Sequence, residues 1–171
     1  MTWYETKTIR YTTTMEQELL EKLINHALKL LTRRQQSEGE LRQKLTRYLY
    51  KKKVEKANLY VDEVIAFLHR KKLLNDELYA SAYTRDRLLL KPRSKKMLRL
   101  ELQRKGIAND LIEKELEEYD EEEALRKVIN KKRNYTPEEL VQYLLRQGFP
   151  YDLIKQVVRT LPAQPGSSPR D

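Results

Sequence analysis

The amino-acid sequence matches itself when it is shifted by 42 residues, the separation of Ser94 and Thr136, and this repeat constrains the fold more than any other feature. The agreeing pairs are Ser94 and Thr136, Leu98 and Leu140, Leu102 and Leu144, Gly106 and Gly148, Ile107 and Phe149, Asp110 and Asp152, and Ile112 and Ile154. A shift of 57 residues places Ser37, Leu41 and Leu45 on Ser94, Leu98 and Leu102. Such recurrence is typical of proteins in which short units bury their apolar faces against their neighbours.

Each unit carries the start and stop signals of short helices. Ser37, Ser94 and Thr136 are residue types that cap helix N-termini, and each precedes leucines that are four residues apart. Gly106 and Gly148 then stand where a helix ends in the left-handed conformation. These signals predict a capped helix, a turn and a further helix in every unit.

We therefore predict an all-α fold of tandem three-helix repeats, about nine helices in an elongated, curved, solenoid-like array. The predicted parts are an extended or flexible arm over residues 1–14, repeats over residues 15–74, 75–118 and 119–160, and a disordered tail over residues 161–171. Because three units can stack on one another and no long heptad seam is present, a monomer is expected.

The centre of the chain contains a helix that ends at a proline. Asp76 stands at its N-cap position, and Pro92 stops it because proline lacks the amide that a helix interior needs. Asn109 or Asp110 is expected to cap a later helix. The residues that recur at helical spacing before Pro92 are Leu78, Ala82, Arg85 and Leu89.

The charge balance points to a polyanionic partner. Lys and Arg number 35 against 26 Asp and Glu, a formal net charge of +9. No stretch approaches the ~20 apolar residues that a membrane span needs. The absence of cysteine excludes disulfides and thiolate chemistry and fits the reducing cytoplasm, where we expect the protein.

Basic residues are densest around Pro92. The candidate contacts at this central break are Arg85, Arg87, Lys91, Arg93, Lys95 and Lys96. The candidates at the ends of other helices are Arg33, Arg34, Arg70, Lys71, Lys131, Lys132 and Arg133. Such cations also serve as ordinary solvated or helix-terminal residues, and the density at the break is what favours binding there.

Two further features leave alternatives open. Some tyrosines could stack on nucleobases, although packing is the more common role at helical spacing: Tyr48, Tyr50, Tyr60, Tyr79, Tyr83 and Tyr143. The acidic run over residues 117–123 could solvate a connection, repel DNA or fold back on the basic patch.

No pattern in the sequence indicates catalysis. His26 and His69 lie in different predicted helices, and four glycines at scattered positions exclude a phosphate-binding or dinucleotide-binding loop. We expect no cofactor, no metal and no enzymatic activity.

Three segments in order resemble the RecX family of RecA recombinase modulators: SEGELRQKL at residues 37–45, LLNDELYASAY at 73–83 and LRLELQRKGI at 98–107. The resemblance covers residues 27–158. The matching positions are Ser37, Glu40, Leu41, Lys44, Leu45, Leu74, Asp76, Tyr79, Ala80, Glu101, Leu102, Lys105, Gly106 and Ile107. The departures are Lys72, Pro92 and Ser94 at frequent glycine positions, Asn75 for aspartate and Tyr79 for phenylalanine.

The resemblance implies a non-enzymatic regulator that binds in the groove of a RecA filament on single-stranded DNA. It implies modulation, mainly inhibition, of recombinase, ATPase and coprotease activity, and so an effect on DNA repair and the SOS response. An alternative is a protein that binds DNA or RNA directly, since a capped helix, glycine turn and second helix also fit a loose helix-turn-helix pattern. A third possibility is a helical scaffold that binds an acidic protein.

Overall fold

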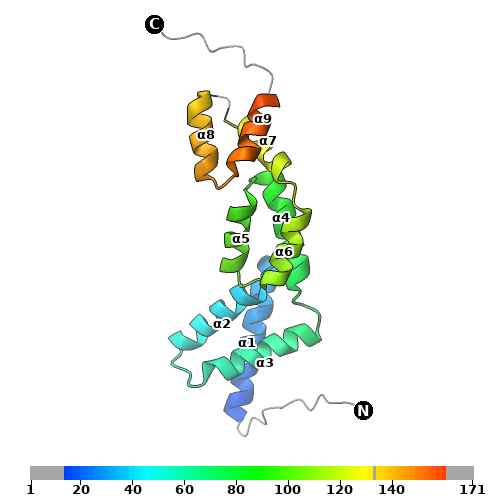
Figure 1. Ribbon diagram of the computed structural model, residues 1–171. Coiled ribbons are helices and arrows are strands. Elements are labelled where there is room, and N and C mark those ends of the chain that lie inside the picture. Colours follow the sequence, from blue (N-terminus) through cyan, green and yellow to red (C-terminus); the bar gives the residue numbers. More distant parts are fainter. Residues whose placement is uncertain (1–13, 133, 161–171) are drawn as a thin grey trace, which may run out of the picture. The chain divides into compact units, whose positions relative to one another are not determined.

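The computed structural model describes residues 14–132 and 134–160, and all regular structure in these ranges is α-helical (Figure 1). Position 133, the predicted arm up to residue 13 and the predicted tail over 161–171 lie outside the described residues. The helices are α1 (Thr14–Arg33), α2 (Glu38–Lys51), α3 (Ala57–Arg70), α4 (Asp76–Leu90), α5 (Lys95–Arg104), α6 (Asn109–Glu118), α7 (Glu121–Asn130), α8 (Pro137–Arg146) and α9 (Tyr151–Thr160). The prediction of an all-α fold with about nine helices is confirmed for this part of the chain.

The chain divides into two compact units, whose described parts are residues 14–76 and, without position 133, residues 77–160. The first unit contains α1, α2 and α3, and the second contains α5 to α9 with all of α4 except its first residue. The core of the second unit draws on both the second and the third predicted repeats, because one cluster of buried residues extends from Tyr79 to Val157. The repeat boundaries stay a prediction.

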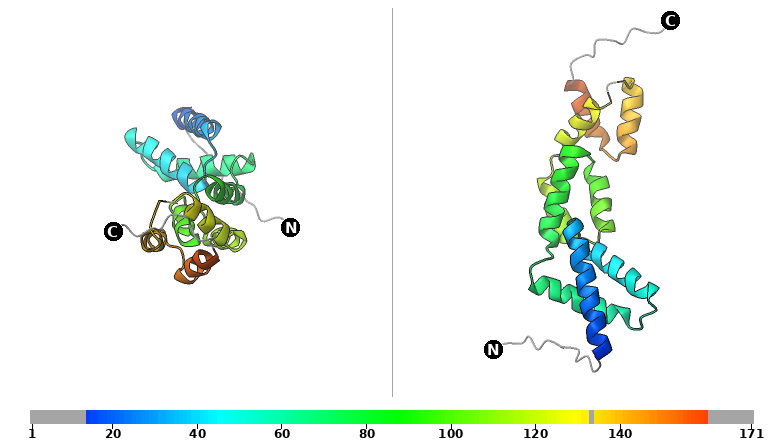
Figure 2. Two further views of the ribbon diagram at one scale, coloured as in Figure 1. Left: turned by 90° about the horizontal axis from the view of Figure 1, so that it is seen from above. Right: turned by 180° about the vertical axis from the view of Figure 1, so that it is seen from behind.

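In the first unit, α1, α2 and α3 pack against one another (Figure 2). Their buried side chains form a leucine-rich core. Each buried leucine stabilises the unit by roughly 2 kcal/mol through the apolar surface it removes from water. The core residues are Leu23, Ala27, Leu41, Leu45, Leu49, Val61, Val64, Ile65, Leu68 and Leu74.

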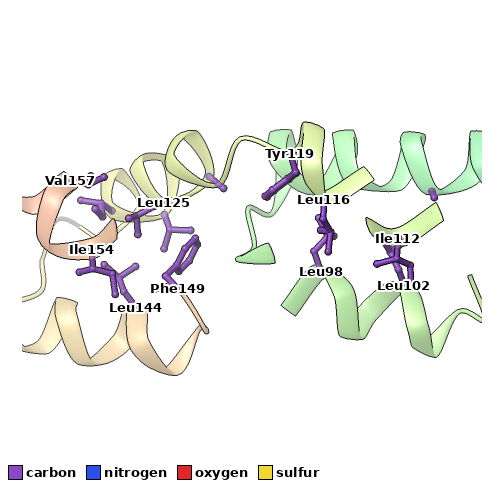
Figure 3. Packing of buried hydrophobic residues seen from close by; sticks show 14 of the residues in the cluster. Leu98, Leu102, Ile112, Leu116, Tyr119, Leu125, Leu144, Phe149, Ile154 and Val157 are labelled. Atoms are coloured by element: carbon purple, nitrogen blue, oxygen red, sulfur yellow. The ribbon is translucent and has the colours of Figure 1, made fainter. Parts of the chain in front are cut away.

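In the second unit, the repeat-related apolar residues are buried as their spacing predicts. Leu98 and Leu102 of α5 face Ile112 and Leu116 of α6 (Figure 3). A second group in the same picture gathers around α7, α8 and α9, and consists of Leu125, Leu144, Phe149, Ile154 and Val157. Corresponding apolar positions of the repeat are therefore buried in the same way.

The buried face of α4 is not the one formed by the residues that recur at helical spacing before Pro92. Leu78 and Leu89 are 63% and 58% exposed, whereas Tyr79, Ala80 and Thr84 are buried. Apolar residues occur nearly all round this helix, so leucine spacing alone defined no unique face.

The predicted caps at Ser37, Ser94 and Thr136 are confirmed. Their side chains accept hydrogen bonds from the backbone N–H groups of Glu40, Met97 and Glu139. The predictions for Asp76, Asn109 and Asp110 were wrong.

Asp76 is the first residue of α4, and its carboxylate accepts the N–H of Glu38 at 2.8 Å. Asn109 and Asp110 are already helical, and Ala108 occupies the N-cap position of α6 without a side-chain hydrogen bond. Carboxylates in a first turn also stabilise a helix through its dipole, so the sequence signal was displaced by one or two positions.

In both α2 and α5, the N–H of the first residue donates to a carboxylate from a later helix. The N–H of Glu38 donates to Asp76, and the N–H of Lys95 donates to Glu121 Oε1 at 2.7 Å. Both acceptors are the first residue of a later helix, α4 or α7. In α8 the first residue is Pro137, which has no N–H and requires no such acceptor.

Left-handed residues follow four of the helices. Gly106 and Gly148 have φ of 77° and 83° after α5 and α8, as predicted, and Lys53 and Lys72 take φ of 54° and 55° after α2 and α3. Lys72 stands where the family pattern has glycine, and it adopts the glycine conformation at a steric cost of about 1 kcal/mol.

The environment of Glu38 is expected to make the first unit sensitive to acid. Burial raises the pKa of its carboxyl, but hydrogen bonds from Arg42 and His69, each 2.7 Å long, outweigh burial and hold the pKa below its ordinary value. Since the folded pKa is depressed, the ionised carboxylate stabilises the fold above the unfolded pKa, and this contribution is lost as pH falls through the folded pKa. Burial raises the pKa of nearby Asp76, which acts in the opposite direction.

We therefore expect the first unit to lose roughly 1 kcal/mol of stability from this group between about pH 6 and pH 3. In Glu38→Gln this loss should be absent, while the Asp76 contribution remains. Urea unfolding followed by circular dichroism at several pH values measures the difference between the two proteins. Parallel pH curves for parent and variant would contradict the assignment.

Candidate nucleic-acid and partner interface

The proline break between α4 and α5 lies along α7 in the second unit. Lys131, which follows α7, donates from Nζ to the carbonyl of Leu90 at 3.0 Å, and Glu121 at the start of α7 accepts the N–H of Lys95 at 2.7 Å. The chain from 90 to 95 is thus fastened at both ends and runs antiparallel to α7. This arrangement joins Lys131 to the central cluster, which the sequence did not indicate.

The middle of the break is fixed by buried groups. Ser94 is fully buried, and its Oγ donates to the carbonyl of Gln147 at 2.7 Å as well as accepting the N–H of Met97. The hydroxyl of Tyr119 donates to the carbonyl of Arg93 at 2.8 Å. The cap at Ser94 therefore also attaches α5 to the end of α8.

Two of the predicted contact residues are used inside the fold. Arg87 Nε donates to Glu101 Oε2 at 2.7 Å, and Arg93 Nε lies 3.3 Å from Glu101 Oε1. The side chains of Arg87, Arg93 and Glu101 are only 28%, 21% and 16% exposed. Arg93 also donates from Nη1 to Gln147 Oε1 at 3.1 Å. One carboxylate thus balances two guanidinium groups.

The Tyr83 hydroxyl completes this network. It donates to Glu101 Oε2 at 2.7 Å, and the Arg87 guanidinium lies 4.7 Å from the centre of the Tyr83 ring. Burial and the bond to Glu101 raise the pKa of the Tyr83 phenol. Burial alone would lower the pKa of Arg87, but its partners Tyr83 and Glu101 raise it, so the guanidinium stays charged.

The other central candidates face solvent more fully. Arg85, Lys91 and Lys96 are exposed and Lys95 is half-buried. Among the described residues, none of these four side chains has a hydrogen bond or ion pair. They are the cations of the central break that remain available for a partner.

The candidates at other helix ends have mixed roles. Arg34 pairs with Glu40 at 3.4 Å, Arg70 pairs with Glu63 at 3.7 Å, and Arg33 is exposed. Lys71 Nζ lies 5.9 Å from the centre of the Phe67 ring. These four belong to the first unit, whereas Lys131 and Lys132 belong to the second, and Arg133 lies outside the described residues.

An aromatic pair in the second unit was only half predicted: the sequence analysis named Tyr143 as a possible stacking residue but not its partner Tyr135. Tyr135 and Tyr143 meet edge to face with ring centres 5.5 Å apart, and Lys132 Nζ lies 5.1 Å and 4.9 Å from the two centres. Tyr135 is 37% exposed. The interleaving of Lys132, Tyr135 and the cap at Thr136 was the signal that could have identified it.

Part of the acidic run contacts the basic break. Asp120 caps α7, and Glu121 accepts the N–H of Lys95. One carboxylate of the run, that of Glu121, therefore contacts the basic break, as the fold-back alternative expects. Glu117 and Glu118 are exposed to solvent instead.

The described residues contain no group of three or more histidine, aspartate or glutamate side chains placed to hold a metal. Within the same ranges, no helix has the length and apolarity required to cross a bilayer. Short capped helices in repeated positions, with an ordered basic segment between α4 and α5, define a helical-repeat protein.

Comparisons with known proteins identify the family within this class. A family model described as RecX, second three-helix domain, matches residues 75–116. The chain is 32% identical to Regulatory protein RecX of Clostridium perfringens strain SM101, over 80% of this chain and 67% of that protein. It is 32% identical to Regulatory protein RecX of Chlorobium limicola, over 80% of this chain and 87% of that protein.

A crystal structure of RecX from Lactobacillus salivarius has the same fold, with a TM-score of 0.65 and 26% identity, covering 82% of this chain and 94% of that one. The chain belongs to the RecX family, and it is a RecX-type regulator. It spans about half the length of several other RecX relatives.

Proposed function

We propose that this RecX-type regulator binds the RecA filament on single-stranded DNA and mainly inhibits its strand-exchange, ATPase and coprotease activities. The observation that carries the proposal is the set of exposed cations, Arg85, Lys91 and Lys96, on and beside a segment that the fold holds in place. Several weak contacts on one ordered surface can together give tight binding to a repeating filament.

Charge disfavours a helix-turn-helix mode of direct DNA binding by the second repeat. The helix that would enter the groove is α6, which carries Asp110 and four glutamates against a single lysine. A DNA groove lined by phosphates repels such a helix. Membership of the RecX family and the acidity of α6 together favour the filament over bare duplex DNA as the target.

The test is RecA's ATP hydrolysis on single-stranded DNA in the presence of the triple variant Arg85→Glu, Lys91→Glu and Lys96→Glu. We expect the concentration needed for half-maximal inhibition to rise by about tenfold or more, because each reversal replaces attraction by repulsion. Arg87 and Arg93 are left unchanged because their reversal would disrupt the contacts with Glu101.

The matched control is Arg104→Glu, Lys155→Glu and Arg159→Glu, three exposed residues of the same unit with the same total charge change. It should inhibit like the parent protein. Equal loss in both triple variants would reduce the effect to net charge. Tight, salt-sensitive binding to bare DNA without any effect on the recombinase would favour a direct nucleic-acid binder.

A further inference from the structure

We propose that Tyr135, Tyr143 and Lys132 form a binding site for one unpaired nucleobase of single-stranded DNA, with Lys131 and Lys91 beside it for the flanking phosphates. The proposal deepens the proposed function, since it names the part of the nucleoprotein partner that the protein would touch directly. It rests on contacts within the second unit alone.

The aromatic pair has the geometry of a stacking platform. The planes of the two rings are 83° apart, so the rings meet edge to face and Tyr143 holds the Tyr135 ring in position. Tyr135 is more than one-third exposed although it contacts another aromatic residue. Lys132 Nζ lies over the same ring, so a base would stack on the part of Tyr135 that remains exposed.

The surrounding charge suits a phosphate backbone. Lys132 lies against both rings, and its neighbour Lys131 reaches the carbonyl of Leu90, next to the exposed Lys91. Two carboxylates follow Tyr135 closely in the sequence: Glu138 is exposed, and Glu139 is engaged in the capping box, where it accepts the N–H of Thr136 at 3.0 Å. Cations beside aromatic rings are the combination used to bind single strands without sequence preference.

The end of α8 connects this platform to the break. Gln147 follows Tyr143 by one helical turn, its carbonyl accepts Ser94 Oγ, and its side-chain oxygen accepts Arg93 Nη1. The aromatic pair and the proline break therefore share one region of the second unit. Stacked base pairs of a duplex hide their faces, so the site is specific for unpaired strands.

The test is fluorescence anisotropy with a labelled oligothymidylate and no recombinase present. Tyr135→Ala should weaken binding by about 5- to 100-fold, the range that loss of one stacked base produces, whereas Tyr135→Phe should retain it. The matched control is Tyr151→Ala in the same unit, a more exposed tyrosine with no partner ring among the described residues, which should bind like the parent.

Two further arms separate base from phosphate. A strand of equal length with abasic positions should bind the parent about as weakly as thymidylate binds Tyr135→Ala, and 5-iodouracil in the strand should cross-link under light to the peptide that contains Tyr135. Unchanged affinity in Tyr135→Ala, or an equal loss in Tyr151→Ala, would overturn the site.

The outcomes for this site and for the proposed function are distinguishable. Loss of strand binding in Tyr135→Ala together with a parent protein that leaves RecA unaffected would keep the site and reject the filament function. Inhibition of RecA by the parent, with no effect of Tyr135→Ala on strand binding, would do the reverse.

Discussion

Replacement of Glu101 by alanine should destabilise the second unit by about 2–3 kcal/mol. Removing the carboxylate leaves Arg87 and Arg93 without their anionic partner and takes away the acceptor of the Tyr83 hydroxyl. Loss of one partner of a fully buried pair costs about 3–5 kcal/mol, and the partial exposure of these side chains reduces that figure. Urea unfolding, with hydrogen exchange in α5 to assign the change to this unit, provides the measurement.

The control for this change is Glu113→Ala. Glu113 also binds an arginine, Arg99, at 2.6 Å, but both side chains are well exposed to solvent. Exposed ion pairs contribute little to stability, so this variant should unfold like the parent. Equal stability of the two variants would show that the Glu101 network is merely a surface pair.

The substitution Gly148→Ala should lower the free energy of unfolding of the second unit by about 2–4 kcal/mol. The φ of 83° at Gly148 is unfavourable for alanine, and a Cβ there would come within 2.9 Å of Ser94 Oγ. Ser94 is fully buried and makes two hydrogen bonds, so it has no space into which to move. Backbone strain and the loss of one bond account for the estimated range.

Gly106→Ala is the matched variant, because Gly106 occupies the same position of the repeat with φ of 77°. It should lose about 1–2 kcal/mol, the backbone part alone. The difference in unfolding free energy between the two variants measures the attachment of α8 to Ser94. A difference near zero would mean that this attachment contributes nothing to stability.

Much of the fold could be predicted because the decisive signals are local. Caps such as Ser94 and Thr136, the prolines, and the glycines with positive φ act within one turn of the chain, and the buried leucines follow a period of 3.6. The face of α4 could not be predicted, because it depends on which neighbours Tyr79 and Thr84 meet in the folded unit.

The candidate site was harder to predict for the same reason. Composition identified the density of cations at the break, but it could not separate Arg87 and Arg93, held by Glu101, from Lys91 and Lys96, which face solvent. The partners of an arginine lie far along the chain: Gln147 is 54 residues from Arg93. Lys131 was selected for its position at a helix end, not for its contact with Leu90.

Family membership identifies residues that match the RecX pattern, but it does not say what each of them does. Glu101 belongs to the RecX pattern, and here it organises two arginines and a tyrosine. Gly106 belongs to the same pattern and ends α5 in the left-handed conformation. The contacts of Glu101 and the backbone conformation of Gly106 give both residues a structural role within the second unit. Their place in the family pattern therefore does not require that they touch a partner.

The fastening of residues 90 to 95 along α7 has a thermodynamic consequence. A free loop that binds a partner gives up roughly 1–2 kcal/mol of backbone conformational entropy per residue. Here Glu121, Lys131 and Gln147 have already removed that freedom during folding. Contacts made through this segment would therefore keep most of their enthalpy as affinity, even when each contact is weak.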